Sequence, residues 1–272
     1  MAVSLNKVVF IGNLCSDANI RTTAEDETFG GFYLVTKESW IDSGSGELRE
    51  KSEKHRVSII DSRLANSIGS GAKRGALAYV EGTVQTKELT DRQGHKRFVT
   101  EVVAGFRGKV AILAPVGNVG HVNKVTLIGN MGKDPGVRTI GSGKTFADFS
   151  LATSESWKDK ATGEWRDRTE WHKVSIVVPQ LAERIGRDGA KGRSVYVEGM
   201  LQTRKYTDAQ GVEKSATEVV VGFTGVTQFF DKKAGSDSGP NAARPNGGEQ
   251  QRGSGRVLER AFAGDLDDEV PF

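Results

Sequence analysis

Short hydrophobic segments, separated by polar and glycine-containing stretches, run through the first 230 residues of the chain. In the first half of this region they are rich in β-branched and aromatic side chains and cover residues 8–11, 29–36, 55–60, 78–85 and 98–103. Segments of this length and composition are typical of β-strands. A helical spacing of apolar residues occurs only at 64–68, and Gly69 behind it is expected to end the helix within about two turns. The pattern predicts five strands with one short helix after the third.

The same pattern returns 117 residues later without a gap. Residues 6–106 align with residues 123–223, and 47 of the 101 paired positions are identical. The helical segment of the second copy is 181–185, and Gly186 follows it as the expected stop. A repeat of about 100 residues can enclose a core of its own, so we interpret the chain as two copies of one domain and not as a solenoid.

Five strands with a single helix between the third and fourth are the order expected of an OB-fold. This partly open barrel binds oligonucleotides or oligosaccharides on one face. We therefore predict an all-β protein of two tandem OB-folds, each a five-stranded barrel with one short helix. The N-terminal OB domain is placed at residues 1–115 and the C-terminal OB domain at residues 116–230. Fold alone does not decide between the two classes of ligand.

The character of the chain changes at about Asp231. Residues 232–255 are dominated by Gly, Ser, Asn, Pro and Gln and contain no β-branched residue, so residues 231–264 are predicted to be a disordered linker. Residues 265–272 combine carboxylates with an apolar end and are predicted to be an acidic protein-docking tip. Its partner-binding residues are Asp265, Asp267, Asp268, Glu269, Val270, Pro271 and Phe272. The apolar residues would enter a pocket on a partner whose basic residues face the carboxylates.

Composition indicates a soluble globular protein, with 36% hydrophobic and 27% charged residues. No segment approaches the roughly 18 apolar residues of a membrane span, and the start lacks a secretion signal, so we expect a cytoplasmic, nucleoid-associated protein. Cys15 is the only cysteine, which rules out an intrachain disulfide. The net charge is +3, with 16 Lys/Arg against 14 Asp/Glu in residues 1–115, 16 against 13 in 116–230, and 6 against 8 in 231–272. This balance alone does not establish a polyanion partner.

Aromatic rings and cations occur together in the second copy. Trp157, Trp171 and Tyr206 have lysines and arginines close by in sequence. Unstacked bases of a single-stranded nucleic acid stack on such rings, while each phosphate needs a nearby positive charge. Core packing is the alternative for any one ring, but polar flanking residues favour exposure.

Several motifs of the second copy resemble those of the bacterial single-stranded DNA-binding proteins (SSB). They are Asn123-Lys124-Val125, Gly129-Asn130, residues 151–157, Thr169-Glu170-Trp171-His172, residues 196–199, residues 204–208 and residues 217–220, together with the acidic Pro-Phe end. Two OB domains in one chain resemble the Deinococcus-Thermus type, a homodimer carrying four OB domains. The resemblance implies sequence-independent binding and protection of single-stranded DNA during DNA replication, recombination and repair. It also implies recruitment of replication, recombination and repair proteins through the tip, with no enzymatic activity and no cofactor.

The resemblance also implies a set of DNA-contacting residues. Stacking is expected from Trp157, Trp171 and Tyr206, and in the first copy from Trp40. Phosphate contact is expected from Lys7, Arg21, Lys54, Arg56, Lys87, Lys124, Arg138, Lys158, Lys173, Lys191, Arg204 and Lys205. A stacking phenylalanine that the resemblance implies is missing, because residues 174–179 contain no aromatic side chain.

The first copy departs further from the family pattern. It has Lys54 where the second copy has Trp171, and Leu89 where the second copy has Tyr206. We therefore expect it to hold DNA mainly through phosphate contacts, with a steeper relative salt dependence than the second copy. Phe98 is predicted to supply a substitute ring.

Other functions are weighed against this interpretation. The run Gly141-Ser142-Gly143-Lys144-Thr145 ends like a phosphate-binding loop, but Arg138 replaces its first glycine and a strand pattern follows, so an ATPase is disfavoured. The four histidines lie far apart without cysteine partners, and His55 and His172, at equivalent positions, are predicted to be structural. An RNA-binding OB protein and a pure assembly scaffold remain as alternatives, because stacking and phosphate contact do not by themselves distinguish sugars.

Overall fold

The computed structural model describes residues 3–230 except residues 43, 91–95, 114–119, 142, 160–161, 208–210 and 212. The first copy contains the strands β1 (Leu5–Leu14), β2 (Asn19–Thr22), β3 (Thr28–Ile41), β4 (Leu48–Ile59), β5 (Leu77–Thr90), β6 (Lys96–Ala104) and β7 (Lys109–Leu113), with α1 (Ser62–Ile68) and the 3-10 turn η1 (Gly69–Gly71) between β4 and β5. The second copy contains β8 (Val122–Met131), β9 (Gly136–Thr139), β10 (Thr145–Lys158), β11 (Trp165–Ile176), α2 (Pro179–Asp188), β12 (Ser194–Thr207), β13 (Glu213–Val221) and β14 (Val226–Phe229).

Each copy closes into a five-stranded barrel. In the first copy β1 pairs with β3 and β5, β3 with β4, β4 in parallel with β6, and β6 with β5. The second copy repeats this circuit with β8, β10, β11, β13 and β12. Alternating residues of these strands, such as Val8, Phe10 and Leu34, are buried inside the barrel. The predicted tandem OB-folds are confirmed, because this order of strands, with one helix after the third, is that of the fold.

The strands are longer and more numerous than the hydrophobic pattern predicts. β3 and β4 continue as a hairpin beyond the barrel, and residues 37–41 and 48–52 at its end are exposed on both faces. No apolar alternation marks such a protruding arm, so the pattern stops at the edge of the barrel. β2, β7, β9 and β14 were not predicted; each is four or five residues long and pairs with one side of a barrel strand.

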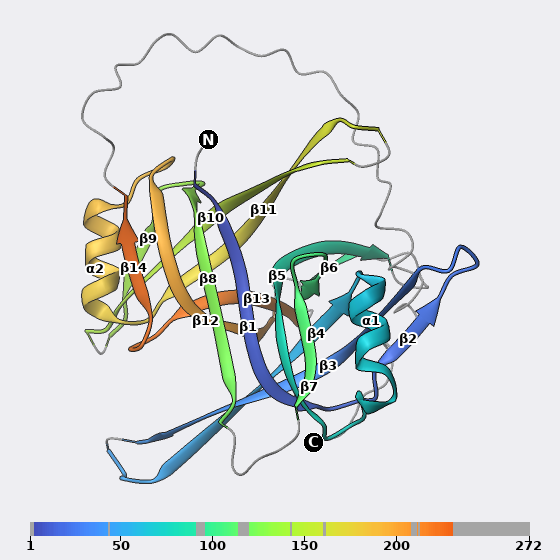
Figure 1. Cartoon of the computed structure of the whole chain (residues 1–272). Coiled ribbons are helices and arrows are strands. Elements are labelled where there is room, and N and C mark those ends of the chain that lie inside the picture. The colour runs from blue at the N-terminus through green and yellow to red at the C-terminus, as the bar shows by residue number, and fades with distance from the viewer. Residues whose placement is uncertain are drawn as a thin grey trace.

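The two barrels are joined through their first strands. β1 and β8 run antiparallel, from Leu5 opposite Ile128 to Ile11 opposite Val122, with the equivalent residues Val8 and Val125 facing each other. The pairing therefore has a local twofold symmetry, and the two strands lie side by side in the middle of the molecule (Figure 1). A single 14-stranded sheet runs through both copies.

The protruding arms of each copy reach the other copy. Arg168 on β11 donates to the Gln85 side chain on β5 over 3.2 Å, and its counterpart Lys51 on β4 donates to Gln202 on β12 over 2.9 Å. In Figure 1 the β10–β11 arm accordingly extends towards the side of the molecule that contains β5 and β6. Burial at this contact raises the pKa of the Glu170 carboxyl, which accepts from the backbone N–H of Thr86.

The two helices begin and end differently. The Asp61 carboxylate caps α1 by accepting from the backbone N–H groups of Arg63 and Leu64, while α2 begins with Pro179 as its first residue. The expected stop at Gly186 is wrong, because α2 continues to Asp188. Gly186 is needed for packing, since a Cβ there would lie 2.5 Å from a methyl group of Val137 on β9.

The paired histidines are buried and structural, as predicted. His55 Nε2 lies 2.8 Å from Thr36 Oγ1, and His172 Nε2 lies 2.8 Å from Thr153 Oγ1. The His55 ring also stacks on Phe10 with a centroid distance of 4.1 Å. Burial lowers the pKa of both imidazoles to about 4.

Two other predictions concern the glycine run at residues 141–145 and the C-terminal segment. Thr145, at the end of the loop-like glycine run, begins strand β10 and not a helix, which agrees with the argument against an ATPase. The predicted linker (231–264) and tip (265–272) lie outside the described residues. Within the part of the chain that the structure describes, no helix has the length and apolar character needed to cross a membrane.

Candidate nucleic-acid interface

A continuous row of aromatic and charged side chains crosses the outer face of the second barrel. It consists of Trp171, Lys173, Glu218, Arg204 and Tyr206, and we call it the Glu218 track. Lys173 Nζ lies 3.7 Å and Arg204 Nε 3.1 Å from the Glu218 carboxylate, and the Arg204 guanidinium lies 5.3 Å from the centre of the Tyr206 ring. Trp171 and Lys173 are two residues apart on β11 and therefore share a face. The track thus joins three strands, β11, β13 and β12.

The Glu218 carboxylate holds the two cations in place at the surface. It is nearly buried and accepts a further hydrogen bond of 2.8 Å from the Ser175 hydroxyl, whereas the side chains of Lys173 and Arg204 are about half exposed. The rings at the two ends are open to solvent, with Trp171 58% and Tyr206 40% exposed. Two exposed rings with cations between them can hold bases by stacking and a phosphate by charge.

The Trp171 indole lies in a seat that exists because residue 132 is glycine. A Cβ on Gly132 would stand 2.3 Å from Trp171 Cζ3 and 2.7 Å from the Ser150 hydroxyl oxygen. Both distances are far below van der Waals contact. The position of the ring therefore depends on Gly132, which directly follows β8, and on Ser150 on β10, and pattern analysis along one strand does not reveal this dependence.

Gly132→Ala is expected to push the Trp171 ring from this seat. Because the ring edge is exposed and can move, the protein should remain folded with nearly unchanged thermal stability. The affinity for oligo-dT should fall by on the order of 1 kcal/mol, the lower end of one stacking contribution. Fluorescence anisotropy measures this, with Gly141→Ala as control, because a Cβ at Gly141 meets open space. Equal affinities of the two variants would show that the seat has no role.

Trp157 lies on the other face of the β10–β11 arm. In the register of the two strands Trp171 faces Ala152 and Trp157 faces Arg166. Ala152 and Trp157 are five residues apart, so their side chains point to opposite faces. The Trp157 ring is 39% exposed, and the guanidinium of Arg168 lies over it at 5.8 Å. The predicted stacking rings therefore occupy two sides of one arm and do not form a single flat platform.

The first copy has an equivalent row, which we call the Glu101 track. It consists of Lys54, Arg56, Glu101, Lys87 and Leu89. Glu101 pairs with Arg56 at 3.2 Å and with Lys87 at 2.6 Å. The cations are retained, but both end rings of the Glu218 track are replaced.

The phosphate contact predicted for Arg56 is not supported by the structure. Its side chain is only 7% exposed, against 43% for the equivalent Lys173. The physical reason lies on the neighbouring strand, where Tyr33 faces Arg56 and the smaller Ser150 faces Lys173. A buried guanidinium paired with a buried carboxylate does not reach a phosphate at the surface.

Phe98, which is predicted to supply a substitute ring, does not occupy the position equivalent to Tyr206. It is 72% exposed, but it faces Glu88 across the β5–β6 pair and shares its side of the ribbon with that residue. Leu89, the counterpart of Tyr206, points to the opposite side. Trp40, near the end of β3, is exposed, as predicted for a ring that contacts a ligand.

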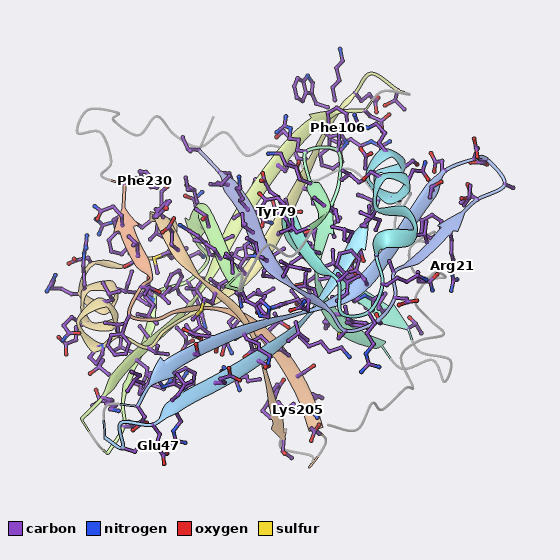
Figure 2. All side chains as sticks on the ribbon, turned by 60° about the horizontal axis from the view of Figure 1, so that its bottom comes forward. Arg21, Glu47, Tyr79, Phe106, Lys205 and Phe230 are labelled. Carbon is purple, nitrogen blue, oxygen red and sulfur yellow. The ribbon has the colours of Figure 1, made fainter. Side chains whose placement is uncertain are left out.

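The remaining predicted cations are spread over the surface. Several have carboxylate partners: Lys7 pairs with Glu81, Lys124 with Glu198, Arg138 with Asp148 and Lys205 with Glu213, at 2.9, 2.8, 2.6 and 3.0 Å. Lys158 and Lys191 are exposed, and exposed Arg21 donates to the Asn19 side chain. Figure 2 shows Lys205 on the protruding end of β12 and Arg21 on β2 at a distant edge, so these cations do not form one patch.

Hydrogen bonds to carboxylates raise the pKa of two tyrosines close to these cations. Glu198 accepts a hydrogen bond from Tyr196 and raises the pKa of the phenol to about 12. In the first copy the equivalent hydrogen bond to Glu81 raises the pKa of Tyr79. The pKa of each carboxyl is lowered, first by its hydrogen bond to Lys7 or Lys124. Glu81 and Glu198 are therefore ionised carboxylates, each with a hydrogen-bonded partner.

Among the described residues no cluster of three or more His, Cys, Asp or Glu is arranged to hold a metal ion.

Comparison with known proteins identifies the family. The profile of the Single-strand binding protein family matches residues 5–110 and again residues 122–227. The chain belongs to this family. Its two matches coincide with the two barrels, and membership makes it a single-stranded DNA-binding protein with two OB-folds.

Individual SSB relatives agree with this assignment. The single-stranded DNA-binding protein of Rickettsia felis is 42% identical over 154 residues, which are 56% of this chain and 99% of that protein. The protein of Rickettsia typhi is 43% identical over 155 residues with the same coverage. The crystal structure of a deletion mutant of the single-stranded DNA binding protein from Thermus aquaticus superposes with a TM-score of 0.65 at 25% identity, covering 87% of this chain and all of the other. The predicted resemblance to the two-domain Deinococcus-Thermus type is confirmed.

Proposed function

We propose that this SSB protein binds and protects single-stranded DNA without sequence preference during DNA replication, recombination and repair, in the cytoplasm beside the nucleoid. The observation that carries the proposal is the Glu218 track, in which the exposed rings of Trp171 and Tyr206 flank two cations held by one buried carboxylate. Every base offers a π-face, so stacking on these rings tolerates any sequence. We propose a binding function and no catalytic one.

The DNA path follows from the placement of the rings. A DNA strand bound to the Glu218 track passes Trp171 on one face of the β10–β11 arm. Trp157 lies on the other face of the arm. A strand that contacts both must bend around the arm. We therefore propose that DNA wraps around the protein, with the Glu101 track continuing the contact through Lys54 and Lys87.

The experiment that tests this function is a titration of intrinsic tryptophan fluorescence with poly-dT, beside a duplex of equal phosphate concentration. Strong, stoichiometric quenching by the single strand only is expected, because bases stack on Trp157 and Trp171. No quenching, or an equal response to the duplex, would contradict the proposal. A parallel titration with oligo-U tests the RNA-binding alternative, since tighter binding to oligo-U than to oligo-dT would favour it.

We further propose that two chains form a homodimer with four OB domains. The resemblance to the two-domain type supports this proposal. Light scattering should give about twice the 29.3 kDa mass of one chain at micromolar concentration. A mass of one chain that does not change with concentration would contradict it.

The tip is proposed to recruit replication, recombination and repair proteins. Deleting residues 265–272 removes the carboxylates and the apolar end that would dock. It should abolish binding to such partners and leave DNA affinity unchanged or raised, since an acidic tail competes with DNA for the cations. Pull-down and oligo-dT titration of the same deletion variant measure both effects. Weaker DNA binding after the deletion would contradict this proposal.

A further inference from the structure

Three equivalent positions in the two copies carry different side chains that interact as a group. In the second copy they are Gly132, Ser150 and Trp171, and the indole lies over Gly132 beside Ser150. In the first copy the same positions hold Cys15, Tyr33 and Lys54. The backbone is the same in both, because Cys15 N–H donates to Tyr33 O, and Gly132 N–H donates to Ser150 O, each over 2.9 Å.

The first copy has no room at position 54 for an indole in the orientation of Trp171. Cys15 carries the Cβ that would stand 2.3 Å from the ring in the second copy. An aromatic ring is nevertheless present in the group, because Tyr33 on β3 replaces Ser150. Each group of three therefore contains one ring, on β11 in the second copy and on β3 in the first.

The Tyr33 ring is partly accessible and is in contact with Lys54, one of the cations of the Glu101 track. Tyr33 is half-buried, and Lys54 Nζ lies 4.4 Å from the centre of its ring. Val35, the register partner of Lys54, is two residues from Tyr33, so ring and ammonium share the outer face of the β3–β4 pair. Burial raises the pKa of the Cys15 thiol, and the charge of Lys54 acts against this by lowering it.

We propose that Tyr33 is a base-stacking residue of the first copy, which takes over the role of Trp171 from the adjacent strand, with Lys54 as its phosphate-binding partner. This inference rests on the proposed function and adds a residue to it. In the free protein the Lys54 ammonium covers the ring. Lys54 is exposed, and a cation at an exposed site is held over a ring more weakly than a stacked base. When DNA arrives, the ammonium moves to a phosphate and a base takes its place on the ring.

The inference changes what is expected of the first copy. The absence of the Trp171 and Tyr206 counterparts suggested binding mainly through phosphates. With Tyr33 beside the Glu101 track, the first copy contributes stacking as well, in addition to the exposed Trp40. The ring was missed because alignment of equivalent positions compares Lys54 with Trp171 and gives no weight to a neighbour on the next strand.

The first test is the affinity of full-length variants for oligo-dT, measured at a salt concentration where dissociation of the parent is measurable. Tyr33→Ser introduces the residue of the second copy and should weaken binding about 5- to 150-fold, the equivalent of one stacked base. Tyr33→Phe, which keeps the ring, should restore most of the affinity. Tyr79→Ser is the matched control, because Tyr79 is another half-buried tyrosine of the first copy with its hydroxyl bound to Glu81.

The second test uses the unsubstituted protein and therefore does not depend on the folding of a variant. Cys15 is the only cysteine of the chain and adjoins Tyr33. Saturating oligo-dT should slow its reaction with a thiol reagent several-fold, and an oligonucleotide with 5-bromodeoxyuridine should crosslink under ultraviolet light to the peptide containing Tyr33. Unchanged thiol reactivity in the bound state, with crosslinks only to other peptides, would overturn the inference.

The outcomes separate this inference from the proposed function. If Trp171→Ala weakens binding while Tyr33→Ser does not, Tyr33 has no stacking role and the function stands. If the parent shows no preference for the single strand over a duplex, the proposed function itself fails. If Tyr33→Ser and Tyr79→Ser weaken binding equally, the effect is structural, and the role assigned to Tyr33 is wrong.

Discussion

Replacing Trp171 and Tyr206 together by alanine is expected to lower the affinity for single-stranded DNA by about 2 to 6 kcal/mol. Each ring contributes about 1 to 3 kcal/mol by stacking on a base. The cations between them, Lys173 and Arg204, remain bound to Glu218 in this variant, so phosphate contact is retained. The residual binding should therefore become relatively more sensitive to salt. Competition binding of a labelled oligo-dT across a salt series measures both quantities.

A matched control for this variant is Phe223→Ala. Phe223 is an exposed ring in the turn between β13 and β14, outside the Glu218 track. Its loss should leave the affinity within about twofold of the parent, a difference of less than 0.5 kcal/mol. The role of the track would be refuted by a double variant that binds like the parent, or by an equal loss in the Phe223 control.

Acidification from pH 6.5 to pH 4.5 is expected to destabilise the protein through His55 and His172. Each has a pKa of about 4 in the folded state against 6.5 when exposed, because burial disfavours the imidazolium. The unfolded chain then binds protons that the folded chain does not, so stability is fully present above pH 6.5 and is lost as the pH falls towards 4. Each histidine contributes about 3 kcal/mol over the full range. For both together the slope is about 2.7 kcal/mol per pH unit below pH 6.

Other groups also affect the pH dependence. Burial lowers the pKa of His121 as well, so this histidine adds to the loss of stability in the same direction. The lowered pKa values of the Glu81 and Glu198 carboxyls concern a range below about 4.5, and the raised pKa of Glu170 acts in the opposite direction. His55→Gln with His172→Gln should therefore flatten the slope, although the loss of the Phe10 contact lowers stability at pH 7. Urea unfolding followed by circular dichroism at several pH values measures the slope. If the double variant kept the slope of the parent, His55 and His172 would not be the cause of that slope.

Some features of the site were accessible from residue types and some were not. Trp157, Trp171 and Tyr206 were predicted to be exposed from their polar flanks, and the structure places all three at the surface. The Glu218 carboxylate was missed because it is remote in sequence from the cations it holds, and no local pattern marks it. Arg56 was assigned to phosphate binding on residue type alone, whereas its burial depends on Tyr33 and Glu101 on two neighbouring strands.

The sequence by itself determined the duplicated OB-fold, the five barrel strands with one helix, and the family. These follow from apolar periodicity and from motifs, which are local properties read along one strand at a time. Only the tertiary structure decided that β1 and β8 join the barrels, that the arms reach the opposite copy, and that a ring missing from position 54 is present at Tyr33. Such features arise between strands distant in sequence, where the fit of one side chain depends on the space left by another. Gly132 and Cys15 show this most directly. The Cβ that Cys15 has and Gly132 lacks decides whether an indole on the facing strand can take the orientation of Trp171.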